Sequence, residues 1–288
     1  MILKNYKNLF IKSLSNIYPK DEIDTFFFYL IEEYLQLKRI DISLQPNFEI
    51  NDTQLKLLNS ALERLQKEEP IQYILGKTEF FGYPFFVNEH TLIPRPETEE
   101  LVEWILNELK SQKVEKLESN KISILDMGTG SGCIPISLAK NLPNAKITAI
   151  DISEEALNVA QKNALLNKVD INFMEFDILS SNNMQTQFDI IVSNPPYVRE
   201  LEKKEIKNNV LHYEPHSALF VPDDNPLLFY DAIASFAKNH LSENGLLFFE
   251  INQYLAEETV QMLLQKGFSS IILKKDGFGN NRMIKASI

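Results

Sequence analysis

The spacing of apolar residues divides the chain into a helical first part and an alternating second part. In residues 25–37 and 53–66, apolar side chains recur every three or four positions, which predicts amphipathic helices. No glycine occurs before Gly76 to interrupt this pattern. Residues 71–93 differ, because aromatic side chains there gather around glycine and proline. That composition predicts a short hairpin or connector.

From residue 121 onward, short apolar runs alternate with longer amphipathic segments. The predicted strands are 121–127, 145–151, 171–177, 188–194, 244–251, 268–276 and 281–288. The predicted helices are one that begins at Pro96, then 132–142, 153–167, 226–241 and 255–267. This alternation predicts an α/β fold with a mainly parallel sheet and helices on both faces. The last two strands, joined by a turn rich in glycine and asparagine, predict a hairpin that makes one strand antiparallel.

Composition places the chain among soluble globular proteins and excludes several classes of function. Of its 288 residues, 44% are hydrophobic and 24% charged. The net charge of −11 argues against stable binding to long nucleic acid, because binding to phosphates needs an excess of lysine and arginine. The single cysteine, Cys133, allows no internal disulfide and fits a reducing compartment.

The first residues carry no signal for export or for a membrane. The apolar run from Phe26 to Ile31 is far too short to span a bilayer, and no long apolar core precedes a small-residue cleavage site. We therefore expect a cytoplasmic protein with no membrane partner.

A glycine-rich loop follows the first predicted strand of the alternating part. It consists of Gly128, Thr129, Gly130, Ser131 and Gly132. Glycines allow a backbone to approach a ligand closely, and in such sheets ligands bind beyond the carboxyl ends of the strands. Asp151 ends the next strand, roughly 20 residues further on, where an acidic side chain can accept both hydroxyls of a ribose. The pattern predicts a ligand that contains a nucleoside.

Two other interpretations of this loop stay open, a dinucleotide site and a simple tight turn. Its G-x-G-x-G spacing differs from the G-x-G-x-x-G of dinucleotide sites, and the absence of Gly-Lys-Ser/Thr argues against a nucleoside triphosphatase. A tight turn beside a surface aspartate would also give this sequence. Asp126, just before the loop, can orient the loop by accepting backbone N–H groups or can accept from a ligand amine.

A second motif, Asn-Pro-Pro-Tyr, follows the predicted strand 188–194. It comprises Asn194, Pro195, Pro196 and Tyr197. Proline fixes its own φ, has no N–H, and holds the preceding residue extended, so this turn is stiff. A stiff turn suits a polar clamp, although a strand that simply stops at an asparagine turn is the plainer alternative.

Together, the glycine loop, the acidic residue after the second strand and Asn-Pro-Pro-Tyr resemble an S-adenosylmethionine-dependent methyltransferase of the Rossmann-like class. Within that class, Asn-Pro-Pro-Tyr is similar to the signature of enzymes that methylate planar amide or amino nitrogens. Residues 69–106 and 213–219 resemble the HemK/PrmC family, which methylates glutamine in peptide chain release factors. The resemblance covers nearly the whole chain. The Arg-Pro-Glu-Thr-Glu run at 95–99 resembles the release-factor enzymes more than the related ribosomal-protein glutamine methyltransferases.

The resemblance implies a class I methyltransferase sheet with a small helical N-terminal domain. It divides the chain into a helical substrate-recognition domain at 1–75, a hairpin or linker at 76–95, and a methyltransferase domain at 96–288. The implied reaction is N5-methylation of the glutamine in the Gly-Gly-Gln motif of release factors, with S-adenosylmethionine as the methyl donor.

The same resemblance implies a role for each motif residue. The side-chain carbonyl of Asn194 and the backbone carbonyl of Pro195 would accept the two N–H groups of the substrate amide, and Tyr197 would pack its ring on the amide plane. Pro196 completes the substrate-binding turn. The implied cofactor contacts are Gly128, Thr129, Gly130, Ser131, Gly132, Asp151, Ile178 and Asn194, with Ile178 as an apolar wall against the adenine.

Several alternatives and departures remain beside this interpretation. A DNA adenine N6-methyltransferase and a nucleoside-binding scaffold without catalysis are the other candidate functions. His212 and His216 are separated by Pro215 and no cysteine pair exists, so no metal site is expected. Arg95 can form a structural salt bridge or contact the substrate. Asn252 stands where the family commonly has glycine after Glu-Ile, and the segment Asp-Asp-Asn-Pro-Leu-Leu lacks the usual Asp-Gly-Leu.

Overall fold

The computed structural model describes residues 1–45, 47–111, 122–180 and 184–288. Its internal contacts divide the chain into two compact units. The helical unit is Met1–Gly76 with Lys207–Tyr213, and the sheet unit is Lys77–Ile206 with Glu214–Ile288.

The helical unit buries a core of large apolar side chains between short helices. Its helices are α1 (Leu3–Leu14), α2 (Lys20–Leu35), α3 (Arg39–Leu44), α4 (Asp52–Leu65), α5 (Ile71–Leu75) and α10 (Asn208–Tyr213). The helices predicted in 25–37 and 53–66 are confirmed as α2 and α4, which end at Leu35 and Leu65. Helix α4 starts at a capping box, in which Asn51 Oδ1 accepts from Gln54 N at 2.9 Å and Gln54 Oε1 accepts from Asn51 N at 3.1 Å.

The helical unit takes in a segment from the middle of the chain. Asn208 Nδ2 donates to Glu68 Oε2 at 3.1 Å, and the Tyr213 hydroxyl donates to the Lys67 carbonyl at 2.7 Å. The sequence did not predict that this segment joins the N-terminal helices. The three-part division at 75/76 and 95/96 stays a prediction.

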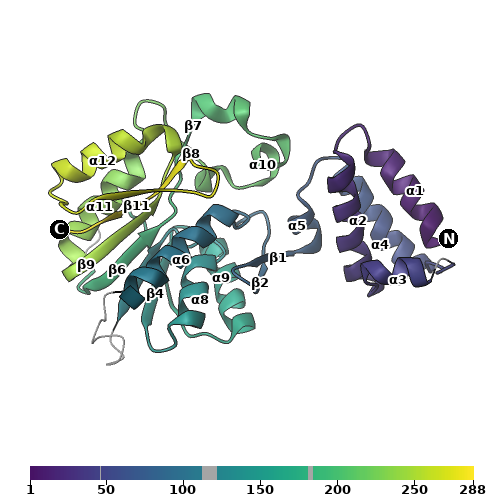
Figure 1. Cartoon of the computed structure of the whole chain (residues 1–288), viewed down its shortest axis with the longest axis horizontal. Helices are drawn as coiled ribbons and strands as arrows, with labels where there is room; N and C mark the ends of the chain where they lie inside the picture. The colour runs from purple at the N-terminus through teal and green to yellow at the C-terminus, as the bar shows by residue number, and fades with distance from the viewer. Residues whose placement is uncertain (46, 112–121, 181–183) are drawn as a thin grey trace. The chain divides into compact units, whose positions relative to one another are not determined.

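A seven-stranded sheet organises the sheet unit (Figure 1). Its strands are β3 (Ser123–Met127), β4 (Lys146–Asp151), β5 (Asn172–Glu175), β6 (Phe188–Ser193), β9 (Leu241–Glu250), β10 (Ile272–Lys275) and β11 (Asn281–Ala286), in the order β10-β11-β9-β6-β3-β4-β5. The pairs from β5 to β9 are parallel, and β11 runs antiparallel to both its neighbours. The predicted α/β fold with one antiparallel strand in a terminal hairpin is confirmed.

Helices cover both faces of this sheet, as the strand pattern predicts. The helices are α6 (Pro96–Ser111), α8 (Cys133–Asn141), α9 (Glu154–Asn167), α11 (Leu228–His240) and α12 (Ala256–Gln265). Alternate residues along a strand point to opposite faces. Ile124 and Ile190 therefore join the core under α6, α8 and α9, while their neighbours Leu125 and Ile191 join the core under α11 and α12 (Figure 1).

Short elements complete the sheet unit. They are β1 (Lys77–Phe80), β2 (Tyr83–Phe86), β7 (Val198–Arg199), β8 (Phe220–Val221) and the 3₁₀ turns η1 (Glu200–Glu205), η2 (His216–Ala218) and η3 (Gln253–Leu255). Strands β1 and β2 form an antiparallel hairpin, which confirms the hairpin predicted within 71–93. Strand β9 begins at Leu241, before the predicted residue 244, and its pairing with β6 shifts register between Phe188 and Ile190.

The β1–β2 hairpin is fixed to α9 by two buried amides. Asn163 Oδ1 accepts from Phe86 N at 2.6 Å, while its Nδ2 donates to the carbonyls of Phe86 at 2.9 Å and Ser131 at 2.8 Å. Asn167 Nδ2 adds a bond to the Pro84 carbonyl at 2.9 Å. Asn163 thus joins the hairpin, the helix and the glycine loop.

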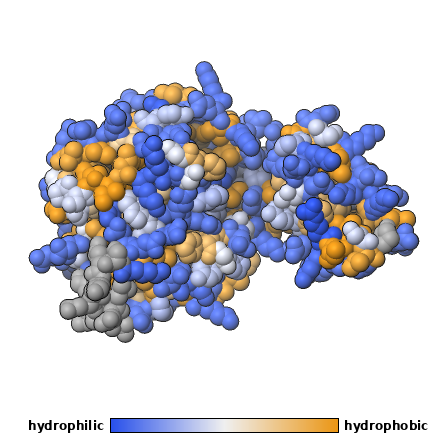
Figure 2. All heavy atoms as spheres, in the orientation of Figure 1, coloured by the Kyte–Doolittle hydropathy of each residue, from blue (hydrophilic) through white to orange (hydrophobic). Residues whose placement is uncertain are grey.

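Hydrophilic residues cover most of the face in Figure 2, with apolar atoms in separate patches. In the helical unit, apolar atoms gather over α3, where Ile40 is 61% exposed and Leu44 is 70% exposed. In the ranges that the structure describes, no helix combines the length and the apolar character needed to cross a membrane.

Candidate active site

The carboxyl ends of four neighbouring strands bring the predicted polar residues to one edge of the sheet. Gly128 follows β3, Asp151 ends β4, Asn194 follows β6 and Glu250 ends β9. Parallel strands present their carboxyl ends together, and ligands of open α/β sheets bind there. The edge therefore holds both sequence motifs.

The glycine loop combines an open backbone with a tight helix contact. Gly130 has φ +54°, and a Cβ at that position would meet no atom within 4 Å, so the backbone is open to a ligand. Gly132 has φ +80°, and a Cβ there would lie 3.0 Å from Ile136 and 3.1 Å from Ala160. Gly130 thus fits the predicted approach to a ligand, whereas Gly132 is needed to pack α8 against α9.

Asp151 is anchored to the loop by both of its carboxylate oxygens. Oδ2 accepts from Gly130 N at 2.8 Å, and Oδ1 accepts from Ser153 N at 3.0 Å. Burial raises the pKa of Asp151, and these backbone N–H groups oppose that rise. A carboxylate oxygen can accept more than one hydrogen bond, so each retains a position for a ribose hydroxyl.

Asp126 is the least satisfied polar group at this edge. Its side chain is fully buried, and neither carboxylate oxygen has a hydrogen-bond partner among the described residues. Burial raises the pKa of Asp126 to about 7; the nearby Thr129 hydroxyl opposes this rise, and the charge of Asp151 adds to it. Of the two predicted roles, orienting the loop through backbone N–H bonds is therefore wrong, and a cationic ligand group would supply the missing partner.

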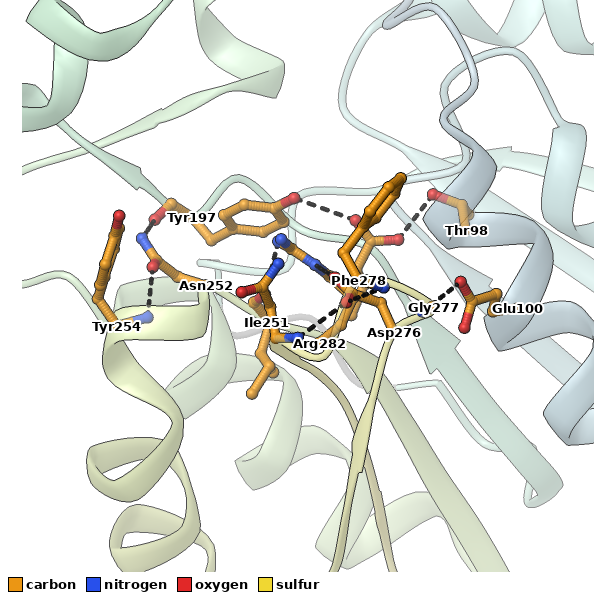
Figure 3. Close-up of polar contacts among 12 residues, drawn as sticks. Thr98, Glu100, Tyr197, Ile251, Asn252, Tyr254, Asp276, Gly277, Phe278 and Arg282 are labelled. Carbon is orange, nitrogen blue, oxygen red and sulfur yellow. Dashed lines mark hydrogen bonds and ion pairs between the residues drawn. The ribbon is translucent and has the colours of Figure 1, made fainter.

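Asn194 belongs to a chain of hydrogen bonds that ends on a buried carboxylate. Its Nδ2 donates to Thr98 Oγ1 at 3.2 Å, and Thr98 Oγ1 donates to Glu250 Oε2 at 2.6 Å. The Tyr197 hydroxyl donates to the other carboxylate oxygen at 3.0 Å (Figure 3). Within the described part of the chain, no hydrogen bond uses Asn194 Oδ1 or the Pro195 carbonyl, so both remain acceptors for a ligand.

The carboxylate of Glu250 and the phenol of Tyr197 shift each other's protonation. Burial raises the pKa of Glu250 above its usual value, and the hydrogen bonds from Thr98 and Tyr197 and the charge of Arg282 oppose only part of that rise. Burial and then the charge of Glu250 raise the pKa of Tyr197, so its hydroxyl stays a donor.

Asn252 holds the backbone of the Asn-Pro-Pro-Tyr turn. Its Nδ2 donates to the Tyr197 carbonyl at 2.9 Å, and its Oδ1 accepts from Tyr254 N at 2.9 Å (Figure 3). The same Nδ2 donates to Glu202 Oε2 at 3.0 Å. Glycine, the residue expected here, could make none of these side-chain bonds. Tyr197 is therefore fixed at its hydroxyl by Glu250 and at its backbone by Asn252.

Two other residues of the sequence analysis, Ile178 and Arg95, make contacts within the protein. Ile178 is half-buried and packs against the core under α11 and α12, and its contact with adenine stays a prediction. Arg95 forms an ion pair with Glu214, with Nη2 to Oε1 at 2.6 Å, and Ile93 N donates to the same carboxylate at 3.1 Å. Of the two roles open to Arg95, the structure shows the salt bridge.

Sequence reasoning missed Thr98, Glu250 and Asn252. Glu250 carried a signal, because it is a charged residue between Phe249 and Ile251 at the carboxyl end of a predicted strand. Thr98 lies inside the Arg-Pro-Glu-Thr-Glu run but follows no pattern of its own, and its link to Glu250 crosses 152 residues of sequence.

Comparison with known proteins assigns the chain to a family. Residues 10–76 match the PrmC N-terminal domain, and residues 107–216 match the Methyltransferase small domain. A release factor glutamine methyltransferase of Flavobacterium psychrophilum is 56% identical, with 100% of this chain and 99% of that protein covered. One of Bacteroides thetaiotaomicron is 43% identical, with 96% of each chain covered.

A solved structure agrees at the level of the fold. The T. thermophilus 16S rRNA N2 G1207 methyltransferase, in complex with AdoMet and guanosine, has a TM-score of 0.51 at 19% identity and covers 73% of this chain and 49% of its own. On the evidence of the two full-length relatives and the two domain matches, the chain belongs to the HemK/PrmC family of S-adenosylmethionine-dependent release factor glutamine methyltransferases.

Proposed function

We propose that this enzyme transfers a methyl group from S-adenosylmethionine to the side-chain amide nitrogen of the glutamine in the Gly-Gly-Gln motif of peptide chain release factors. The observation that carries the proposal is the arrangement of Asn194, whose Nδ2 is bonded to Thr98 while Oδ1 remains an acceptor. The relatives that match over the full chain are release factor glutamine methyltransferases, which supports this substrate.

The two acceptors of the motif match the chemistry of a primary amide. An amide nitrogen is a weak nucleophile because its lone pair is delocalised into the carbonyl, and it carries two N–H donors. Asn194 Oδ1 accepts one N–H and the Pro195 carbonyl accepts the other. Both acceptors favour positive charge on the nitrogen as it is alkylated, and they are already in position before the reaction. The Tyr197 ring packs on the amide plane, and Pro196 keeps the turn stiff.

Residues of the neighbouring strands fit the methyl donor. When bound, S-adenosylmethionine supplies a methyl group on a positively charged sulfur, which makes that carbon strongly electrophilic. Asp151 binds the ribose hydroxyls, and the open backbone at Gly130 lies against the ligand. Asp126, buried without a partner, accepts from the ligand's ammonium group. Thr129 and Ser131 complete the loop, and Ile178 forms the apolar wall.

No general base is assigned to this reaction. Both oxygens of Glu250 already accept hydrogen bonds, from Thr98 and Tyr197. An alkylated amide nitrogen is acidic, so its proton can pass to water. The chain's residues act by binding and orienting the amide, so that the nitrogen, the methyl carbon and the sulfur lie in line for transfer.

The helical unit recognises the protein substrate. Its match to the PrmC N-terminal domain supports this role, and the exposed apolar side chains of Ile40 and Leu44 on α3 provide a surface against which a protein can pack. Release factors act with the ribosome, so the proposed site of action is the cytoplasm.

The test is a transfer assay with labelled S-adenosylmethionine. It offers purified release factor, its Gly-Gly-Gln→Gly-Gly-Ala variant and duplex DNA in parallel. We expect label on the wild-type factor alone. Label on DNA alone would establish a DNA adenine methyltransferase instead, and cofactor binding without any transfer would favour a nucleoside-binding scaffold.

Two variants separate the motif from the cofactor site. Asn194→Ala lowers turnover by about two to three orders of magnitude, the usual effect of removing one preorganised hydrogen-bonding group. We expect Asp151→Ala mainly to weaken cofactor binding. Turnover near that of the wild type in Asn194→Ala would refute the amide clamp, and unchanged cofactor affinity in Asp151→Ala would refute the ribose contact.

A further inference from the structure

Glu250 is a buried charge that the proposed reaction does not use directly. Glu250 ends β9, is only 1% exposed, and lies in sequence between the apolar residues Phe249 and Ile251. A buried carboxylate is costly unless it is fully hydrogen-bonded, and an apolar side chain of similar volume would often stabilise the fold more. Its two donors, Thr98 and Tyr197, therefore suggest a purpose other than stability.

The carboxylate sets the direction of every hydrogen bond up to Asn194. Both carboxylate oxygens of Glu250 accept, one from Thr98 Oγ1 at 2.6 Å and the other from the Tyr197 hydroxyl, so the single proton of the Thr98 hydroxyl points toward Glu250. Thr98 Oγ1 can then only accept from its other neighbour, 3.2 Å away. The group of Asn194 that faces Thr98 must accordingly be the NH₂ group, which turns Oδ1 away from Thr98 and keeps it free as an acceptor.

Without this direction the clamp could invert. An asparagine amide has a donor end and an acceptor end of nearly the same shape. If Thr98 instead donated to Asn194, the amide would turn its NH₂ group outward. A donor would then face the N–H groups of the substrate amide and repel them.

We propose that Glu250, acting through the Thr98 hydroxyl, is a positioning residue that holds the Asn194 amide with its carbonyl toward the substrate. The inference rests on the proposed glutamine methylation. Glu250 makes no contact with the reacting atoms in this scheme. It supplies the direction of a hydrogen bond, while its second oxygen fixes the hydroxyl of Tyr197.

The first test removes the intermediate hydroxyl. Thr98→Val keeps the shape of the side chain but breaks the link, and we expect kcat on release factor to fall about tenfold to a hundredfold, the effect of one hydrogen bond to a charged group. The Kd for S-adenosylmethionine stays unchanged. Thr98→Ser restores the hydroxyl and brings kcat back to within a few-fold of the wild type.

A matched control separates positioning from stability. Thr259 of α12 is also fully buried, and its hydroxyl donates at 2.7 Å to the carbonyl of Leu255, the residue just before that helix. Thr259→Val therefore removes a buried hydroxyl at a similar cost in urea denaturation but leaves kcat at the wild-type value. An equal loss of kcat in Thr259→Val would overturn the inference, because the effect would then reflect stability.

A double-mutant cycle tests whether the effect passes through Asn194. We expect Thr98→Val to have no further effect on kcat in the Asn194→Ala background. An equal fold-decrease of kcat in both backgrounds would overturn the inference, as would wild-type kcat in the Thr98→Val single variant.

Glu250→Gln is the second variant. It can offer an NH₂ group to Thr98, and we expect a loss of kcat at least as large as that of Thr98→Val.

The activity of the wild-type enzyme distinguishes a failure of the proposed function from a failure of the positioning role. If it transfers no label to release factor, the proposed function fails and the positioning role falls with it. If it transfers label and Thr98→Val is equally active, only the positioning role fails.

Discussion

Replacing Asn163 by leucine should loosen the β1–β2 hairpin and the cofactor loop together. The side chain is fully buried and of nearly the same shape as leucine, so the substitution removes hydrogen bonds without a large change in volume. It breaks the bonds to the N–H and carbonyl of Phe86 and to the carbonyl of Ser131.

The magnitude follows from these three bonds. Each contributes about 1 kcal/mol net, so the free energy of unfolding should fall by roughly 3 kcal/mol. The Ser131 carbonyl belongs to the glycine loop, and a loop that must be ordered on binding lowers affinity. Losing the equivalent of one bond at that step, about 1 kcal/mol, would raise the Kd for S-adenosylmethionine about fivefold.

Urea denaturation and a calorimetric titration with S-adenosylmethionine measure the two effects separately. Gln161→Leu is the matched control, because Gln161 lies on the same helix but is exposed, and it should change neither quantity. A fall in stability of less than about 1 kcal/mol would refute the reasoning that this amide fixes the hairpin. An unchanged Kd beside the expected loss of stability would refute only the link to the cofactor loop.

Three further changes test other contacts. The pKa of Asp126 is raised from 3.8 to about 7, so the folded protein retains a proton that the unfolded chain loses, and without ligand its stability should decline by roughly 4 kcal/mol as pH rises from about 4 to about 7. Asp126→Asn should remove most of this decline, which urea unfolding midpoints at several pH values would measure, and it should also weaken cofactor binding. If the midpoints of the wild type and the variant changed with pH in the same way, this explanation would be contradicted. Asn252→Gly frees the Tyr197 carbonyl, so kcat should fall several-fold at constant cofactor affinity, and steady-state kinetics with an unchanged kcat would exclude that support. Glu214→Gln removes the charge opposite Arg95 and should cost about 1–3 kcal/mol in urea denaturation, whereas no change would show that the pair is not stabilising.

Local pattern was enough to predict the architecture of the sheet unit. Alternation of strands and helices, with Gly130 at the first strand-to-helix turn and Asn194 after β6, predicted where the carboxyl edge would gather polar groups. The start of β9 could not be predicted, because Asn244 adopts φ +63° within the strand and shifts its pairing with β6, an irregularity that depends on the neighbouring strand.

The support of the site depends on contacts between distant residues. Thr98 and Glu250 are separated by 152 residues, and Asn252 and Tyr197 by 55. No sequence pattern around either residue of such a pair indicates which residue it will contact. The motif residues were predicted because their chemistry is concentrated in four consecutive positions, whereas the residues that orient them come from α6 and β9.

The segment Lys207–Tyr213 has a consequence for protein engineering. The backbone passes from one unit to the other three times, after Gly76, after Ile206 and after Tyr213. A fragment that begins at Lys77 would therefore contain α10 but lack Glu68 and Lys67, with which α10 forms hydrogen bonds. Chimeras that exchange the N-terminal helices between relatives must transplant this second piece as well, since the two pieces form a single graft.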